Sequence, residues 1–462
     1  MSCYFISIGG TGAKVMESLT HLCIAGLLPN DERLYIAAID PDVGNGNLER
    51  TSAALNNFVA FQNFSVGNDT PLFKNKISIV RPFPFNPTGH DKTLDDLTEY
   101  HQHSTGVGKL YAALYTRAER SVTLNEGFRG HPSIGAAVLA KNFGDGSNRT
   151  TLTAQIEKLI GEGDSVKIFL AGSVFGGTGA AGLPTVARLL RDNLADYADR
   201  ISIGGALILP YFSFTPTDIG DELFARSENF LPNTKAALKY YADRENLFDA
   251  TYLVGDSVMT AVKDFSVGSA NQRNEAHIVE LYAALAAADF FAQPTKKKIF
   301  KYICRHERDK FSWDDLPTSR ERFVQFARFI FAYVHLVKPV LNNLVSGEAA
   351  AYKYPWFVDL LGGVKVTDPD VVNFSFYAEA FAAWLKQLET FGGREIFLID
   401  PAAFESNPAR IVDKKIFSAL DGIQSKVTLH EVWYRLTEPL KLESSVTGFG
   451  KFLRRLYEAC AA

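Results

Sequence analysis

Short apolar runs alternate with longer amphipathic stretches through the first half of the chain. Residues 4–8 form an apolar run that ends in glycines, and a helical pattern covers about 13–28. The same succession of apolar run, polar turn and helical pattern recurs further along. The other expected strands are 34–39, 166–170, 201–209 and 251–254, and a further expected helix is about 180–193. This alternation predicts an α/β fold with a mostly parallel sheet covered by helices on both faces.

The second half has a different pattern. Residues 274–291 form one long apolar stretch without glycine or proline, which predicts a long central helix. A basic, hairpin-like stretch is expected at 296–308, and Thr318-x-x-Glu321 predicts a capping box at the start of the next helix. Beyond it, helices are expected at about 374–390 and 452–460, and a strand at 396–399.

The chain is long enough for more than one domain. We expect an α/β domain over 1–273 with a long insertion-like segment at 43–129, the central helix at 274–293, and a smaller α+β C-terminal domain over 294–462. Hydrophobic residues make up 47% and charged residues 22% of the chain, which is ordinary for a globular protein.

Charge and cysteine content narrow the choice of partners. The 48 Lys and Arg against 52 Asp and Glu give a net charge of −4, which argues against nucleic acid as a partner. The four cysteines form no Cys-x-x-Cys pair, and His101 and His103 have no evident third ligand, so no metal site built from protein ligands alone is expected. No signal-peptide pattern or run of 18 apolar residues occurs, so we expect a cytoplasmic protein without a membrane span.

Two glycine-rich segments carry the clearest chemistry. Gly9-Gly10-Thr11-Gly12 follows the first expected strand, and Gly176-Gly177-Thr178-Gly179 follows the strand at 166–170. Glycines at the start of a helix let main-chain amides approach a phosphate, and the helix dipole favours the anion. Two such segments in one sheet predict a polyphosphate held from both sides.

The glycine-containing stretches do not match two common phosphate-binding motifs, the Walker A motif and the dinucleotide fingerprint. Gly108-Lys109 is followed by Leu110, where a Walker A motif needs serine or threonine. Gly10-x-Gly12 has Val15 at the third glycine position of the dinucleotide fingerprint. A Rossmann-type dinucleotide enzyme is therefore kept only as an alternative.

The second glycine segment, with its surroundings, resembles the signature loop of the tubulin/FtsZ superfamily. The stretch 171–184 reads AGSVFGGTGAAGLP, with the flanking Ala-Gly and the downstream proline of that signature. Val174-Phe175 departs from it by adding a residue and replacing the first glycine. The resemblance covers about 1–295 and implies a divergent prokaryotic tubulin-like protein that binds GTP or GDP with Mg²⁺ in the first domain.

Four more segments resemble loops of this family in the order that the family requires: the first phosphate loop at 8–15, the loop near phosphate and magnesium at 38–42, the γ-phosphate-sensing loop at 130–135, and the ribose loop at 204–212. The resemblance implies these nucleotide-binding residues: Gly9, Gly10, Thr11, Gly12, Ala13, Asp40, Asp42, Gly130, His131, Ser133, Gly135, Ser173, Phe175, Gly176, Gly177, Thr178, Gly179, Ala180, Pro210 and Phe212.

In this family, asparagine or aspartate side chains near the start of the central helix bind the base. Asn274 is the best match, and Asn271 is a weaker one. The alternative for Asn274 is an N-cap of that helix, a position that favours asparagine.

Hydrolysis in this family needs a second subunit, whose acidic residues after the central helix position the attacking water. The nearest acidic loop here contains Asp314 and Asp315, with Glu321 behind them. The alternative is that the two aspartates only stabilise the N-terminus of the following helix.

The resemblance therefore implies a GTP-binding protein that self-assembles head to tail and hydrolyses GTP between subunits. The displaced acidic loop and the long 43–129 segment favour a second possibility. This is a GTP-binding scaffold or adaptor, with little or no hydrolysis, in a larger prokaryotic assembly.

Overall fold

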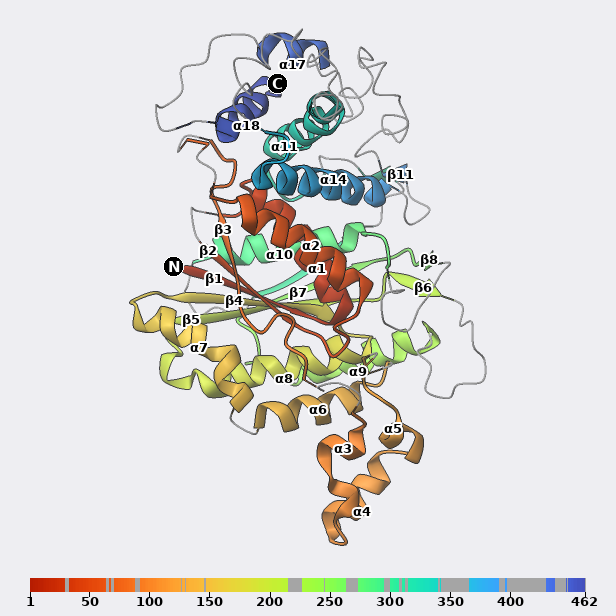
Figure 1. Ribbon diagram of the computed structural model, residues 1–462. Helices are drawn as coiled ribbons and strands as arrows, with labels where there is room; N and C mark the ends of the chain where they lie inside the picture. The colour runs from red at the N-terminus through yellow and green to blue at the C-terminus, as the bar shows by residue number, and fades with distance from the viewer. Residues whose placement is uncertain are drawn as a thin grey trace.

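Seven parallel strands form the central sheet of the protein, in the order β3-β2-β1-β4-β5-β7-β9 (Figure 1). The computed structural model describes residues 1–29, 33–63, 66–67, 70–87, 92–125, 127–128, 130–144, 147–214, 227–244, 246–262, 273–294, 300–306, 310–311, 315–339, 341, 365–389, 395–396, 429–436, 446 and 448–461. The strands are β1 (Ser2–Ile8), β2 (Arg33–Ile39), β3 (Lys76–Ile79), β4 (Val166–Ser173), β5 (Ile201–Ile208), β7 (Ala250–Asp256) and β9 (Phe300–His306). The predicted parallel α/β sheet is therefore confirmed.

Helices cover both faces of this sheet, as predicted (Figure 1). One face carries α1 (Gly9–Ile24), α2 (Gly46–Phe61) and α10 (Ile278–Ala292), and a further layer on these helices contains α11 (Arg320–Ala332), α14 (Pro369–Glu389) and α18 (Gly448–Ala459). The other face carries α6 (Pro132–Gly144), α7 (Ser147–Gly161), α8 (Gly177–Asn193) and α9 (Phe230–Ala242).

Successive side chains of each strand point to opposite faces of the sheet, so the buried apolar residues form two cores, one on each face. In β1, Phe5 belongs to the first core, whereas Tyr4 and Ile6 belong to the second. Every position of β1 is buried, because successive side chains point to opposite faces and both faces are covered. The continuous apolar runs of the sequence follow from this double coverage.

The C-terminal helices pack against α1 and α2 rather than standing apart (Figure 1). His21 Nδ1 lies 3.1 Å from the Tyr377 hydroxyl of α14, and Arg454 of α18 donates to the Val66 carbonyl at 3.0 Å. Burial lowers the pKa of His21 from 6.5 to about 3, so the ring stays neutral. The division at residue 293/294 remains a prediction.

Within the basic stretch 296–308, the described residues 300–306 differ from the expected hairpin. Residues Phe300–His306 form β9, which pairs in parallel with β7 at the edge of the main sheet. Tyr302 stacks on Tyr252 of β7 with ring centroids 4.4 Å apart. An edge strand tolerates interspersed lysine and arginine, so the charge concealed a strand.

Two helix starts also differ from the prediction. α1 begins at Gly9 and not near Ala13, so the first glycine segment is the first turn of the helix itself. The N-cap of α11 is Ser319, without a side-chain cap hydrogen bond, so the capping box expected at Thr318 is wrong.

An arm formed by residues 92–125 projects away from the sheet, below α6 in Figure 1. It contains α3 (Leu94–Thr98), η1 (Tyr100–Gln102), α4 (Gly106–Leu114) and α5 (Arg117–Ser121). Its small core joins Leu94, Tyr111 and Leu124 to Phe128 and to residues of α6. The expected insertion-like segment thus supplies both this arm and α2, which belongs to the main body.

The remaining described elements are short: β6 (Phe212–Phe214), β8 (Thr260–Val262), β10 (Lys310–Phe311), β11 (Glu395–Ile396), η2 (Ala195–Tyr197), η3 (Ser227–Asn229), η5 (Tyr333–Val337) and α17 (Leu429–Leu436). Within the described ranges, no helix is long and apolar enough to cross a membrane.

Candidate functional site

A cavity that is open to solvent lies beyond the carboxyl ends of β1, β2 and β4. Its lining residues are Gly9, Gly10, Thr11, Lys14, Asp40, Asp42, Asn45, Asn47, Gly127, Phe128, Gly130, Ser173, Phe175, Gly176, Gly177, Thr178, Gly179, Tyr211, Phe212, Phe230 and Asn274. Ligands in parallel α/β folds bind at this edge of the sheet.

The N-termini of α1 and α8 meet at one end of the cavity, which we call the glycine end (Gly9–Gly10, Gly176–Gly179, Asp40 and Asp42). Gly9 has a φ of +70°, and a Cβ atom built on it would lie 3.0 Å from Thr178 Cβ. The two glycine segments therefore touch. Both helices present main-chain amides and the positive ends of their dipoles to the same space, which favours an anion.

Side chains larger than hydrogen do not fit in the second glycine segment. A Cβ atom on Gly177 would lie 3.0 Å from Gly130 N and 3.0 Å from Phe128 Cβ. A Cβ atom on Gly179 would collide with the main chain of Ser173. These glycines are required by the close approach of neighbouring main chain.

Asp40 is the unusual charge at the glycine end. Its side chain is buried, Oδ1 accepts a hydrogen bond from Asp42 N at 3.1 Å, and Oδ2 has no partner. Burial raises the pKa of Asp40 from 3.8 to about 8, and the Asp42 amide opposes this only in part. A buried carboxylate with an unpartnered oxygen is suited to a cation or to a donor carried by a ligand.

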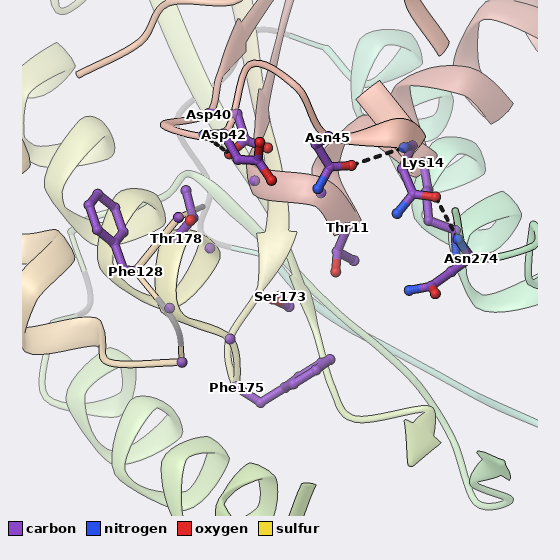
Figure 2. Close-up of a pocket in the computed structure, with 18 of the residues that line it drawn as sticks. Thr11, Lys14, Asp40, Asp42, Asn45, Phe128, Ser173, Phe175, Thr178 and Asn274 are labelled. Carbon is purple, nitrogen blue, oxygen red and sulfur yellow. Dashed lines mark hydrogen bonds between the residues drawn. The ribbon is translucent and has the colours of Figure 1, made fainter. Parts of the chain in front are cut away.

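The opposite end of the cavity is lined by amide and ammonium groups, and we call it the asparagine end (Lys14, Asn47 and Asn274). Asn45 caps α2, where its Oδ1 accepts from Asn47 N at 2.9 Å. Asn47 Oδ1 in turn accepts from Asn274 N at 2.8 Å, and Arg50 donates to the Asn274 carbonyl at 3.0 Å. Figure 2 shows Lys14 and Asn274 across the cavity from Asp40, Asp42 and Thr178.

The structure also tests the alternative that Asn274 is the N-cap of the central helix. The N-cap of α10 is His277, whose ring accepts from Val279 N while Glu280 accepts from His277 N. Asn274 lies three residues earlier, with its main chain held on both sides and its side chain at the cavity. The N-cap interpretation is therefore wrong.

Lys14 forms a buried ion pair at the asparagine end. Its ammonium contacts Glu280 Oε1 of α10, and the Tyr211 hydroxyl donates to the same oxygen. Lys14 is 4% exposed and Glu280 is 0% exposed. Burial lowers the pKa of Lys14, and the neighbouring Glu280 acts in the opposite direction.

Aromatic rings line the cavity between its two ends. Phe175 packs on Phe230 with centroids 4.5 Å apart and on Phe212 at 5.7 Å. Tyr211 packs on His277 at 4.8 Å. The residue inserted into the second glycine segment, Phe175, thus supplies part of an apolar wall suited to a flat ring.

Several predicted site residues do not line the cavity: Gly12, Ala13, His131, Ser133, Gly135, Ala180 and Pro210. Ser133 and Gly135 lie in α6, and His131 Nδ1 faces Glu119 of the arm at 3.3 Å. Asn271 and Asp314 lie outside the described residues. Asp315 is half-buried, and its carbonyl accepts from the Tyr282 hydroxyl at 2.7 Å.

Seven lining residues were not predicted from the sequence: Lys14, Asn45, Asn47, Gly127, Phe128, Tyr211 and Phe230. Lys14 carried a usable signal, because a lysine in the first turns of a buried helix after a glycine segment needs a partner. Its partner is 266 residues away along the chain, and that pairing could not be read from the pattern.

Together, the parallel α/β fold and the two converging glycine segments define a cavity that is suited to an anionic ligand at the carboxyl ends of the strands. Residues 116–316 match the family model described as "Tubulin like". This segment includes the second glycine segment and α10, so this part of the chain is similar to tubulin-like proteins. No curated protein matches the chain.

Solved structures of three archaeal proteins are similar to the chain. CetZ from Methanosaeta thermophila strain DSM 6194 is 15% identical with a TM-score of 0.27, and the match covers 55% of this chain and 46% of that one. CetZ2 from Haloferax volcanii, described as a GTPγS-bound protofilament, is 16% identical with a TM-score of 0.29, covering 64% and 60%. CetZ1 from Haloferax volcanii, a GDP-bound monomer, is 13% identical with a TM-score of 0.28, covering 55% and 51%. The matches thus span about half the length of these structures.

Proposed function

We propose that the cavity binds GTP and GDP, with the phosphates at the glycine end and the base toward the asparagine end. The observation that carries the proposal is the convergence of two glycine-rich helix N-termini on one cavity. Main-chain amides there can donate to phosphate oxygens from both sides. The aromatic wall and the asparagine end provide stacking and hydrogen-bonding groups for a nucleoside.

Asp40 and Asp42 are the residues that would hold Mg²⁺ beside the phosphates. Both line the glycine end, and Asp40 Oδ2 has no protein partner. In the part of the chain that the structure describes, no group of three or more His, Cys, Asp or Glu is placed to hold a metal alone. This fits Mg²⁺, which commonly shares its coordination between one or two carboxylates, phosphates and water. When bound, the metal would neutralise charge on the phosphates.

Self-association is supported by the course of α10 across the sheet. The helix starts near the cavity, where Glu280 meets Lys14. Near its end, the Phe291 carbonyl accepts from Lys167 at 2.6 Å, at the N-terminal side of β4. The two ends of α10 therefore lie at opposite ends of the strands. Head-to-tail stacking would bring the C-terminal end of α10 in one subunit to the cavity of the next.

Asp289 joins Asp314 and Asp315 as a candidate for the acid that acts on the neighbouring subunit's nucleotide. It is an exposed aspartate in the last turns of α10, and its Oδ2 accepts from the Tyr252 hydroxyl at 2.6 Å. Asp315 instead contacts Tyr282, in the half of α10 nearer the cavity. Asp289 thus fits a role across a head-to-tail contact better than Asp315.

The test of this function is nucleotide turnover per subunit, measured with GTP and with ATP over a range of protein concentrations. Turnover that is selective for GTP and rises steeply with concentration would support a site completed between subunits. GTP binding without turnover at every concentration would leave the binding proposal in place and reject the assembling GTPase.

The acidic candidates are separated by Asp289→Asn and Asp315→Ala, each compared with the wild type in GTP affinity and in turnover. The acid that acts in trans should lose turnover by at least about tenfold and keep its affinity, because general acid–base groups contribute roughly 10²–10⁴-fold. Equal turnover in a variant removes that residue from the mechanism.

A GTP-binding scaffold with little turnover is the second candidate function. The observation that favours it is that Asp289, in the last turns of α10, is already engaged by Tyr252, and the neighbouring Gln293 bonds to its other oxygen at 3.2 Å. A carboxylate held in this way is less free to orient a water molecule. Sedimentation with and without GTP distinguishes a scaffold from an assembling GTPase.

A further inference from the structure

The buried ion pair between Lys14 and Glu280 lies at the wall of the cavity. The other buried residues of α10 are all apolar, and a buried pair of charges is costly unless both partners are well satisfied. Glu280 is satisfied three times, by Lys14, by the Tyr211 hydroxyl and by the His277 amide at 2.8 Å. The site therefore fixes the position of the Lys14 ammonium.

A nearby ion pair joins α1 to α2 rather than to α10. Glu17, one turn further along α1, accepts from Arg50 of α2 at 2.9 and 2.7 Å. Neither Glu17 nor Arg50 lines the cavity, whereas Lys14 does. The two pairs provide a comparison, because Lys14 lines the cavity itself, whereas Glu17 reaches it only through Arg50, which donates to the Asn274 carbonyl at 3.0 Å.

An ammonium group offers only hydrogen-bond donors. At its sixth ring position guanine presents a carbonyl oxygen, which accepts, whereas adenine presents an amino group, which donates. A fixed ammonium beside that position would attract the first and repel the second. Discrimination of this kind combines a favourable contact with a penalty against the competitor.

We propose that Lys14, held by Glu280, selects the 6-oxo group of a purine nucleotide over a 6-amino group. The assignment rests on the proposed function, which places the phosphates at the glycine end. Figure 2 shows Lys14 beside Asn274, across the cavity from Asp40, Asp42 and Thr178, where a base would lie in that orientation. Lys14 is then a specificity-determining residue, and Glu280 is its positioning residue.

The test uses four triphosphates that vary the sixth and second ring positions separately. GTP and inosine triphosphate carry the 6-oxo group with and without a 2-amino group. The triphosphates of 2,6-diaminopurine riboside and adenosine carry the 6-amino group with and without it. Dissociation constants are measured by calorimetry for the full chain, for Lys14→Met and for the control Glu17→Gln.

For the wild type and Glu17→Gln, both 6-oxo nucleotides should bind at least about tenfold more tightly than their 6-amino counterparts. In Lys14→Met this ratio should fall toward one, mainly through weaker binding of the 6-oxo nucleotides. Because Lys14→Met leaves Glu280 buried without its cation, the double variant Lys14→Met/Glu280→Gln is measured as well, with thermal unfolding as the check of folding.

An unchanged ratio in the folded double variant would overturn the assignment of Lys14. Equal affinity of the wild type for all four nucleotides would also overturn it and would leave the nucleotide site itself in place. Failure of all four to bind the wild type would reject the proposed function, and the assignment with it.

Discussion

The two ends of the cavity are lined in different ways. At the glycine end, the ligand space is bounded by main chain and by the lack of side chains, with Asp40 as a buried carboxylate. At the asparagine end, it is bounded by side chains whose positions are fixed by other side chains, as Asn47 fixes Asn274 and Glu280 fixes Lys14.

The difference explains what each end can recognise. Main-chain amides at helix N-termini are the same hydrogen-bond donors whatever base the ligand carries. They therefore suit a phosphate chain, which all nucleotides share. Fixed amide and ammonium groups differ in donors and acceptors, so they can tell one base from another. Substitutions at the glycine end should weaken the binding of all phosphate ligands alike. At the asparagine end, the effect of a substitution on affinity should depend on the base.

The largest effect is expected from Asp40→Asn, on stability rather than on affinity. Because the folded-state pKa of Asp40 is raised from 3.8 to about 8, the native state favours the protonated carboxyl. Wild-type stability without ligand should fall as the pH rises from about 4 to about 8, by at most ~6 kcal/mol. The asparagine variant should lack this fall and be the more stable protein at pH 8.

Urea unfolding at a series of pH values checks this prediction, with free energies compared between wild type and variant. Mg²⁺ should restore part of the wild-type stability at pH 8 and have less effect on the variant. Parallel pH profiles for the two proteins would mean that Asp40 is not a buried acid of raised pKa.

Gly177→Val should abolish or greatly weaken nucleotide binding, by at least about 100-fold, or ~3 kcal/mol. The reason is steric, since even the Cβ atom would lie 3.0 Å from Gly130 N. Titration with GTP and with inorganic triphosphate measures both affinities, and both should fall together. Gly161→Val is the control, because a Cβ atom there meets nothing within 4 Å. Retained affinity in Gly177→Val would remove this segment from the site.

Asn274→Ala should weaken GTP by about tenfold, the magnitude expected for one lost hydrogen bond in a buried site. Its affinity for inorganic triphosphate should be unchanged, because the residue lies at the asparagine end. Competition experiments with the two ligands give the result. Equal weakening of both would mean that the two ends are not independent.

The smallest effect is expected from Thr178→Val, which removes a hydroxyl and keeps the shape of the side chain. Loss of one donor among several main-chain amides should reduce GTP and triphosphate affinity by about two- to tenfold. The same titrations measure this change, with the thermal midpoint as the check of folding. An affinity equal to that of the wild type would show that the main chain alone holds the phosphates.

Much of the glycine end could be predicted from the sequence. Glycine segments, the runs that precede them and Asp40 are local features, because a strand that ends in glycines and enters a helix leaves few other conformations. The parallel sheet followed from short apolar runs that alternate along the chain with amphipathic helical stretches. The helix start at Gly9 was missed because glycine is a poor helix former, although its position here is the first turn.

The asparagine end was decided by the tertiary structure. Lys14, Asn47 and Asn274 come from three elements, and Glu280 from a helix more than 260 residues from Lys14. β9 likewise joined the sheet because β7 offered an open edge, although its sequence is basic. Local sequence thus determined the elements and the anion-binding turns, since these depend on neighbouring residues. Only packing of distant helices could place a lysine against a glutamate at the cavity wall, because burial of that charge requires a partner that the chain brings from far away.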